Sequence, residues 1–143
     1  MIRLAAVALI VTAPALLAAP VPKELLRHDR LEGTWRVESL VTFGKPSSEA
    51  LCWVIDADGN LARNVDPAAP LPPKCSVVLK FDRASKHLDF CQGGTTFAGL
   101  YRLRGDRLEI CLSIQGGERP AAVEAGPRLY LWTLERLKPE EKK

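Results

Sequence analysis

Apolar and polar residues alternate in short runs along most of the chain. Trp35 and Val37 alternate with polar residues over residues 35–39. Every second side chain is again apolar over residues 75–81, where Val77, Leu79 and Phe81 share one face. A period of two indicates a half-buried β-strand, because successive side chains point to opposite faces of a sheet. Turn-forming residues separate these runs every eight to twelve positions, which is typical of an all-β sandwich or barrel.

The clearest predicted unit is a β-hairpin over residues 97–114. Tyr101 and Leu103 alternate with arginines in its first strand, and from Leu108 onward every second residue of its second strand is apolar, with a tight turn at Gly105-Asp106 between them. Further strands are predicted at 51–55, 61–65, 87–90 and 129–137. No helical stripe interrupts the series, so we predict an all-β fold, a small antiparallel barrel of about eight strands.

The first nineteen residues predict an export signal. Arg3 precedes an apolar stretch that ends in small residues, which is the pattern of cleaved signal peptides. The stretch is shorter than the ~20 residues that a membrane span needs, and Pro14 interrupts it. We expect residues 1–19 to be a signal peptide, with cuts after Ala15 or Ala18 compatible with the sequence. The mature protein is then periplasmic or extracellular, with no transmembrane span.

The rest of the chain is predicted to form one domain, because 143 residues leave room for a single core. Residues 20–30 are a charged, proline-containing lead-in linker, residues 31–138 form the barrel domain, and residues 139–143 are a charged tail. Four prolines interrupt residues 66–74 and cannot donate ladder hydrogen bonds, so that segment is predicted to be a loop.

Four cysteines lie in the predicted mature chain, namely Cys52, Cys75, Cys91 and Cys111. An even number in an exported protein permits disulfides, and the sequence does not choose among the three possible pairings. No two of them have the spacing of two to four residues that presents both thiolates to one zinc ion. The sequence therefore predicts no metal site and no cofactor.

Residues 31–35 read Leu-Glu-Gly-Thr-Trp and resemble the Gly-x-Trp opening of lipocalins. In lipocalins that tryptophan closes one end of the barrel and an arginine of the last strand packs over it, so the resemblance implies structural roles for Gly33, Trp35 and Arg136. More closely, residues 31–138 resemble a family of small exported lipocalin-like domains of unknown function that is abundant in planctomycete bacteria. The residues that carry this resemblance are Leu31 to Val37, Gly99 to Leu103, Gly105 to Cys111 and Glu118 to Pro120.

The resemblance implies a lipocalin-like fold and export, and it carries no activity. The proline-rich loop and three of the cysteines, at positions 52, 75 and 91, depart from the common pattern of that family.

The usual signatures of catalysis are missing from the sequence. It contains no Gly-x-Ser-x-Gly elbow, phosphate-binding glycine loop or His-Glu-x-x-His helix. His28 lies in the lead-in and His87 on the polar face of a strand, so both read as surface residues. Asp56 and Asp58 flank a turn without the spacing of a calcium-binding EF-hand loop. We therefore expect a protein that is not an enzyme.

Two functions remain open after these exclusions. The net charge of +3 is spread along the chain without a basic cluster, which argues against nucleic-acid binding. In the first function, the barrel binds a small apolar or amphipathic ligand, with Trp53, Phe97 and Tyr101 as its lining. In the alternative, it is an envelope-associated interaction or structural scaffold domain whose interior is filled by its own side chains.

Overall fold

The computed structural model describes residues 30–47, 52–63 and 77–138. The predicted signal peptide, nearly all of the lead-in with His28, the loop over 66–74 with Cys75, and the charged tail lie outside the described residues. The described part consists of strands joined by turns and loops. The strands are β1 (Gly33–Thr42), β2 (Lys45–Ser47), β3 (Cys52–Ile55), β4 (Asn60–Arg63), β5 (Val77–Asp82), β6 (His87–Gln92), β7 (Thr95–Arg104), β8 (Arg107–Ser113) and β9 (Leu129–Arg136).

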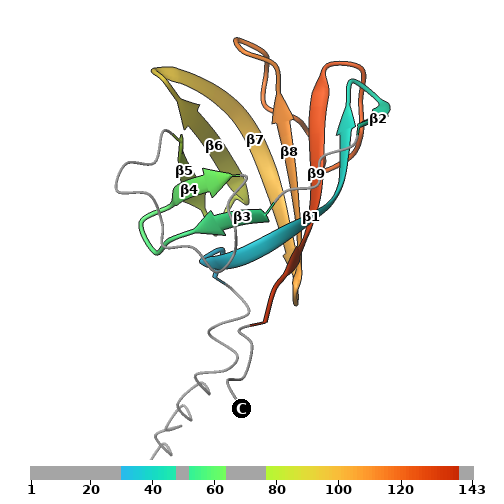
Figure 1. The fold of residues 1–143 in the computed structure, drawn as a ribbon. Helices are drawn as coiled ribbons and strands as arrows, with labels where there is room; N and C mark the ends of the chain where they lie inside the picture. The colour runs from blue at the N-terminus through green and yellow to red at the C-terminus, as the bar shows by residue number, and fades with distance from the viewer. Residues whose placement is uncertain (1–29, 48–51, 64–76, 139–143) are drawn as a thin grey trace, which may run out of the picture.

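Eight of these strands close into an antiparallel barrel (Figure 1). From β3 to β9 each strand pairs with the next one along the chain, and β1 closes the ring by pairing with both β3 and β9. The ninth strand, β2, pairs with residues 40–42 of β1. The prediction of an all-β, small antiparallel barrel of about eight strands is confirmed.

One face of each barrel strand supplies the interior. Directly opposed residues of antiparallel strands share a face, so the register stacks apolar side chains in layers across the sheet. Burying them in one cluster provides the main stabilising free energy of the fold. The cluster consists of Leu31, Trp35, Val37, Leu40, Trp53, Ile55, Leu61, Val77, Leu79, Leu88, Phe90, Tyr101, Leu108, Ile110, Leu112, Trp132 and Leu134.

A β-bulge divides β1 into two halves. The register with β9 shifts between Val37 and Ser39, and Glu38 and Ser39 are both exposed. The half before the bulge pairs with β3 and the half after it pairs with β2. Bulges bend a strand and increase its twist, which lets β1 curve around the barrel. The predicted strand over 35–39 therefore continues past the point where the alternation breaks.

The turn between β3 and β4 is held by Asp56. Its carboxylate accepts hydrogen bonds from the backbone N–H groups of Asp58 and Asn60, both at 2.9 Å, and from the side-chain amide of Asn60 at 2.8 Å. The Asn60 amide, with these backbone donors, lowers the pKa of Asp56. Gly59 has a φ of +86°, and a Cβ there would collide with the carbonyl of Leu79. The acidic residues of this turn thus serve the backbone.

The end of the barrel that contains Trp35, called here the Trp35 end, is closed by an arginine. The guanidinium carbon of Arg136 lies 4.1 Å from the centroid of the Trp35 ring. Arg136 donates to the carbonyls of Glu32 and Arg30, both at 2.6 Å, and the indole N–H of Trp35 donates to the carbonyl of Leu31 at 2.9 Å. Burial lowers the pKa of Arg136, against the opposing effect of nearby acidic groups.

Gly33 makes this arrangement possible. Its φ is +139°, and a Cβ at this position would lie 2.7 Å from the guanidinium Nη1 of Arg136. A side chain would therefore strain the backbone and push the arginine away from its carbonyl acceptors.

Replacing Trp35 tests how much the fold depends on this end. Trp35→Ala removes a fully buried indole, so we expect the free energy of unfolding to fall by about 3–5 kcal/mol. Trp35→Phe keeps a ring beneath Arg136 and is expected to lose clearly less. Urea denaturation of the three proteins measures both values. A loss below about 1 kcal/mol for Trp35→Ala would contradict the role of Trp35 in closing the barrel.

Candidate functional site

A row of aromatic rings marks the opposite end of the barrel, called here the Tyr130 end. The Phe43 ring lies 5.1 Å from that of Tyr130, Tyr130 stacks on Trp132 at 5.6 Å, and Trp132 lies 5.5 Å from Trp53. Phe43 is 44% exposed, whereas Trp53 is fully buried. The row therefore leads from the protein surface at the β1–β2 turn into the barrel interior.

The inner end of this row carries a polar atom without a partner. The indole Nε1 of Trp53 is buried, and it has no hydrogen-bond acceptor in the described part of the chain. Nearly all buried donors in folded proteins are paired, because an unpaired one costs about 1–3 kcal/mol of stability. The indole N–H of Trp53 therefore keeps a hydrogen-bonding capacity that the described part of the chain does not use.

A second aromatic group lies on the other side of the interior at this end. Phe90 of β6 and Phe97 of β7 are opposed in the register, and their rings meet edge to face at 6.0 Å. The guanidinium carbon of Arg63 lies 5.3 Å from the centroid of the Phe90 ring. Phe90 is buried, whereas Phe97 and Arg63 are half-buried. The Tyr130 end thus combines apolar rings with a cation.

The three predicted lining residues are placed in different parts of the barrel. Trp53 is the inner end of the aromatic row and lies directly opposite Trp35 in the register of β1 and β3, whereas Phe97 belongs to the second aromatic group at the Tyr130 end. Tyr101 is buried nearer the other end, where its ring meets Phe81 at 6.3 Å and the ammonium of Lys86 lies 5.6 Å from its centroid.

Tyr130, Trp132 and Arg63 of this end were not among the predicted lining residues. Tyr130 and Trp132 occupy alternate positions of the predicted last strand, so the period of two already placed them on one face. Arg63 lies two residues after the interior residue Leu61, so the same period also indicated its face.

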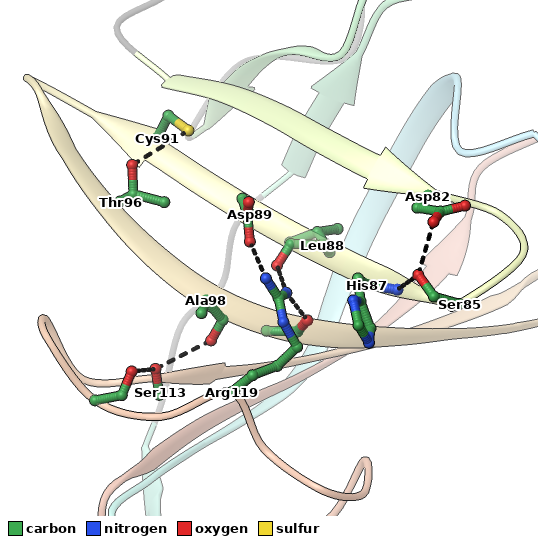
Figure 2. A network of polar contacts seen from close by, with 12 residues as sticks. Asp82, Ser85, His87, Leu88, Asp89, Cys91, Thr96, Ala98, Ser113 and Arg119 are labelled. Carbon is green, nitrogen blue, oxygen red and sulfur yellow. Dashed lines mark hydrogen bonds and ion pairs between the residues drawn. The ribbon is translucent and has the colours of Figure 1, made fainter.

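None of the three described cysteines forms a disulfide. Cys52, Cys91 and Cys111 are free thiols, and Cys75 lies outside the described residues. Cys91 is half-buried on β6, with its sulfur 3.7 Å from the hydroxyl of Thr96 (Figure 2). No two of these three cysteines therefore supply the disulfide that their number permits.

The loop over residues 114–128, between β8 and β9, is anchored to the outside of the barrel by Arg119. One guanidinium nitrogen of Arg119 donates to the carbonyls of Leu88 at 3.2 Å and Gly99 at 2.7 Å, and the other donates to the Asp89 carboxylate at 2.7 Å. Figure 2 shows the side chain reaching from the loop to β6 and β7. The resemblance had singled out Arg119 without a role.

This loop also covers Cys111. The thiol is fully buried and donates to the carbonyl of Glu124 in the loop at 3.4 Å. Burial raises the pKa of the Cys111 thiol, which disfavours its reactive thiolate form. Arg119 and the loop that it anchors therefore have a structural role on the outer face, and this arrangement is called here the Arg119 clasp.

Removing the Arg119 side chain should expose Cys111 to reagents. Arg119→Met loses its charge-assisted hydrogen bonds, and because they are partly exposed we expect local opening to become easier by only about 1–2 kcal/mol. Alkylation of Cys111, followed by peptide mass spectrometry, should accelerate about tenfold. Arg102→Met, which breaks the outer-face ion pair with Glu109, should leave the rate unchanged. Equal rates in the wild type and Arg119→Met would contradict the clasp.

The remaining titratable groups of the outer surface are dispersed. The hydrogen bond from Arg102, at 2.6 Å, lowers the pKa of Glu109, and His87 is exposed at the start of β6. Within residues 30–47, 52–63 and 77–138, no three His, Cys, Asp or Glu side chains gather where they could hold a metal ion. The same ranges contain no helix with the length and apolar character to cross a membrane.

Comparison with known proteins adds no relative. No protein-family model, curated protein or solved structure matches the chain.

Proposed function

We propose that this protein is an exported binding module that takes a small apolar or amphipathic molecule at the Tyr130 end of its barrel. The observation that carries the proposal is the aromatic row from exposed Phe43 to buried Trp53, which ends in an unpaired indole N–H. Ligand sites in proteins typically combine apolar and aromatic lining with a few placed polar groups. The aromatic row supplies the apolar lining and, at its inner end, a polar group in the indole N–H of Trp53.

The two tryptophans that are opposed in the register of β1 and β3 differ in a way that favours this location. At the Trp35 end, the indole N–H of Trp35 and the guanidinium of Arg136 donate to backbone carbonyls. At the inner end of the aromatic row that starts at the Tyr130 end, the donor of Trp53 has no such acceptor among the described residues. A bound molecule that supplies an acceptor would recover the free energy that the unpaired donor costs.

One observation favours the alternative, an interaction domain without a ligand. Phe43 is 44% exposed on the β1–β2 turn, and β2 is the last strand of the described sheet, paired with β1 alone. Exposed aromatic side chains and strand edges are features of protein contact surfaces. We rank this function second because it gives no role to the unpaired donor of Trp53.

Titration with N-phenyl-1-naphthylamine, an uncharged aromatic probe, tests ligand binding directly. We expect saturable binding at one site, followed by probe fluorescence. Tyr130→Ser should weaken it about tenfold, because a stacked aromatic contact and its apolar area are lost. Leu131→Ser changes the next residue of the same strand, whose side chain points to the other face, and should leave the affinity within about twofold.

Two results would contradict ligand binding at this end. One is the absence of saturable probe binding to the wild-type protein, which would favour the interaction domain. The other is an equal loss of affinity in Tyr130→Ser and Leu131→Ser, which would place the probe elsewhere.

We propose export on the strength of the sequence of residues 1–19, with Arg3 ahead of an apolar stretch and small residues. Expression of the full chain in a bacterium should yield a shortened protein in the periplasmic or extracellular fraction. Its intact mass should match a chain that begins at Leu16 or Ala19, the residues after the two compatible cuts. A full-length product that stays in the cytoplasm would contradict export.

A further inference from the structure

Arg63 is an arginine on the interior face of the barrel. It lies at the end of β4, directly opposite Trp53 in the register of β3 and β4. Opposed residues of an antiparallel pair project to the same side of the sheet, and Trp53 is a fully buried core residue. The stacking of the Arg63 guanidinium on Phe90, another core residue, agrees with this direction.

The surroundings of Arg63 distinguish it from the other arginines. Among the described residues, four arginines are half-buried and the rest are exposed. Arg102 is paired with Glu109, Arg119 with Asp89 and two carbonyls, and Arg136 with two carbonyls. Arg63 contacts the face of Phe90, and no described carboxylate lies within 4.0 Å of it. A half-buried cation without an oxygen partner is poised to bind an anion.

Two donors without acceptors therefore belong to opposed residues on the interior face. The indole N–H of Trp53 and the guanidinium of Arg63 belong to opposed residues of β3 and β4, and neither has an oxygen acceptor among the described residues. Around them lie the aromatic row and the Phe90–Phe97 pair, which offer apolar contacts. The interior face of β3 and β4 thus presents positive charge and hydrogen-bond donors within apolar surroundings.

We propose that the ligand is an amphipathic anion, with a carboxylate, sulfonate or phosphate group on Arg63 and an apolar body against the aromatic rings. This inference rests on the proposed function and narrows its ligand class. A guanidinium pairs with an oxyanion through two parallel N–H donors, and the partial burial of Arg63 limits screening by water. A cationic ligand would be repelled by the same charge.

Two fluorescent probes that differ by one anionic group test this inference. N-phenyl-1-naphthylamine is uncharged, and 1-anilinonaphthalene-8-sulfonate adds a sulfonate to the same ring system. The wild-type protein should bind the sulfonate about tenfold more tightly, because charge-assisted hydrogen bonds to Arg63 are added to the same apolar contacts. Raising the salt concentration should reduce this preference.

Arg63→Met should abolish the preference, with the affinity for the sulfonate falling about tenfold and that for the uncharged probe changing less than about twofold. Retained binding of the uncharged probe also shows that the variant is folded. Arg83→Met is the matched control, because it removes the same charge from an exposed residue in the β5–β6 turn. It should leave both affinities unchanged.

The possible outcomes separate the two proposals. If the uncharged probe binds and Arg63→Met leaves the preference for the sulfonate intact, or if no preference exists, the anionic ligand class is wrong and the binding module stands. If neither probe binds, both proposals are wrong. Should Arg63→Met fail to fold, Arg63→Lys, which retains the charge without the planar fork, must keep the salt-sensitive preference in weakened form.

Discussion

Arg136 lies over the ring of Trp35, and this contact joins the last strand of the barrel to the first. The two strands are far apart in the sequence, with 104 positions between Glu32 and the arginine that donates to its carbonyl. Closing so long a segment costs conformational entropy, and the pairing of β1 with β9 has to offset it. A charge at this closure is tolerated because backbone carbonyls surround it, and because Gly33 leaves room for the guanidinium.

A tryptophan and an arginine also lie together on the neighbouring strands β3 and β4, but in a different state. There Trp53 and Arg63 face the interior beside one another, but the chain places no oxygen acceptor against either of them among the described residues. The stability of a barrel would be served equally well by apolar residues at both positions. The Trp35–Arg136 pair satisfies its donors and serves stability, whereas the unsatisfied donors of Trp53 and Arg63 support the proposed role in recognition.

Sequence alone predicted those strands in which alternation is regular. The hairpin of β7 and β8 was predicted because its apolar positions keep a period of two around the Gly105-Asp106 turn. The strand β2 was missed because its three residues are all exposed and carry no apolar pattern. Arg63 was not predicted as part of the site because its charge suggested solvent, whereas its position two residues after Leu61 indicated the interior.

The clasp of Arg119 shows why charge by itself could not locate the site. Arg119 and Arg63 are both half-buried arginines at positions that sequence patterns describe poorly, and only their acceptors separate them. Arg119 donates to a carboxylate and two carbonyls, and these hydrogen bonds hold residues 114–128 against the barrel. The guanidinium of Arg63 instead contacts the face of the Phe90 ring. This contact orients the guanidinium without neutralising its charge. A charge that is positioned but not neutralised favours an anion over a neutral molecule of the same shape, and this difference lies in the tertiary structure.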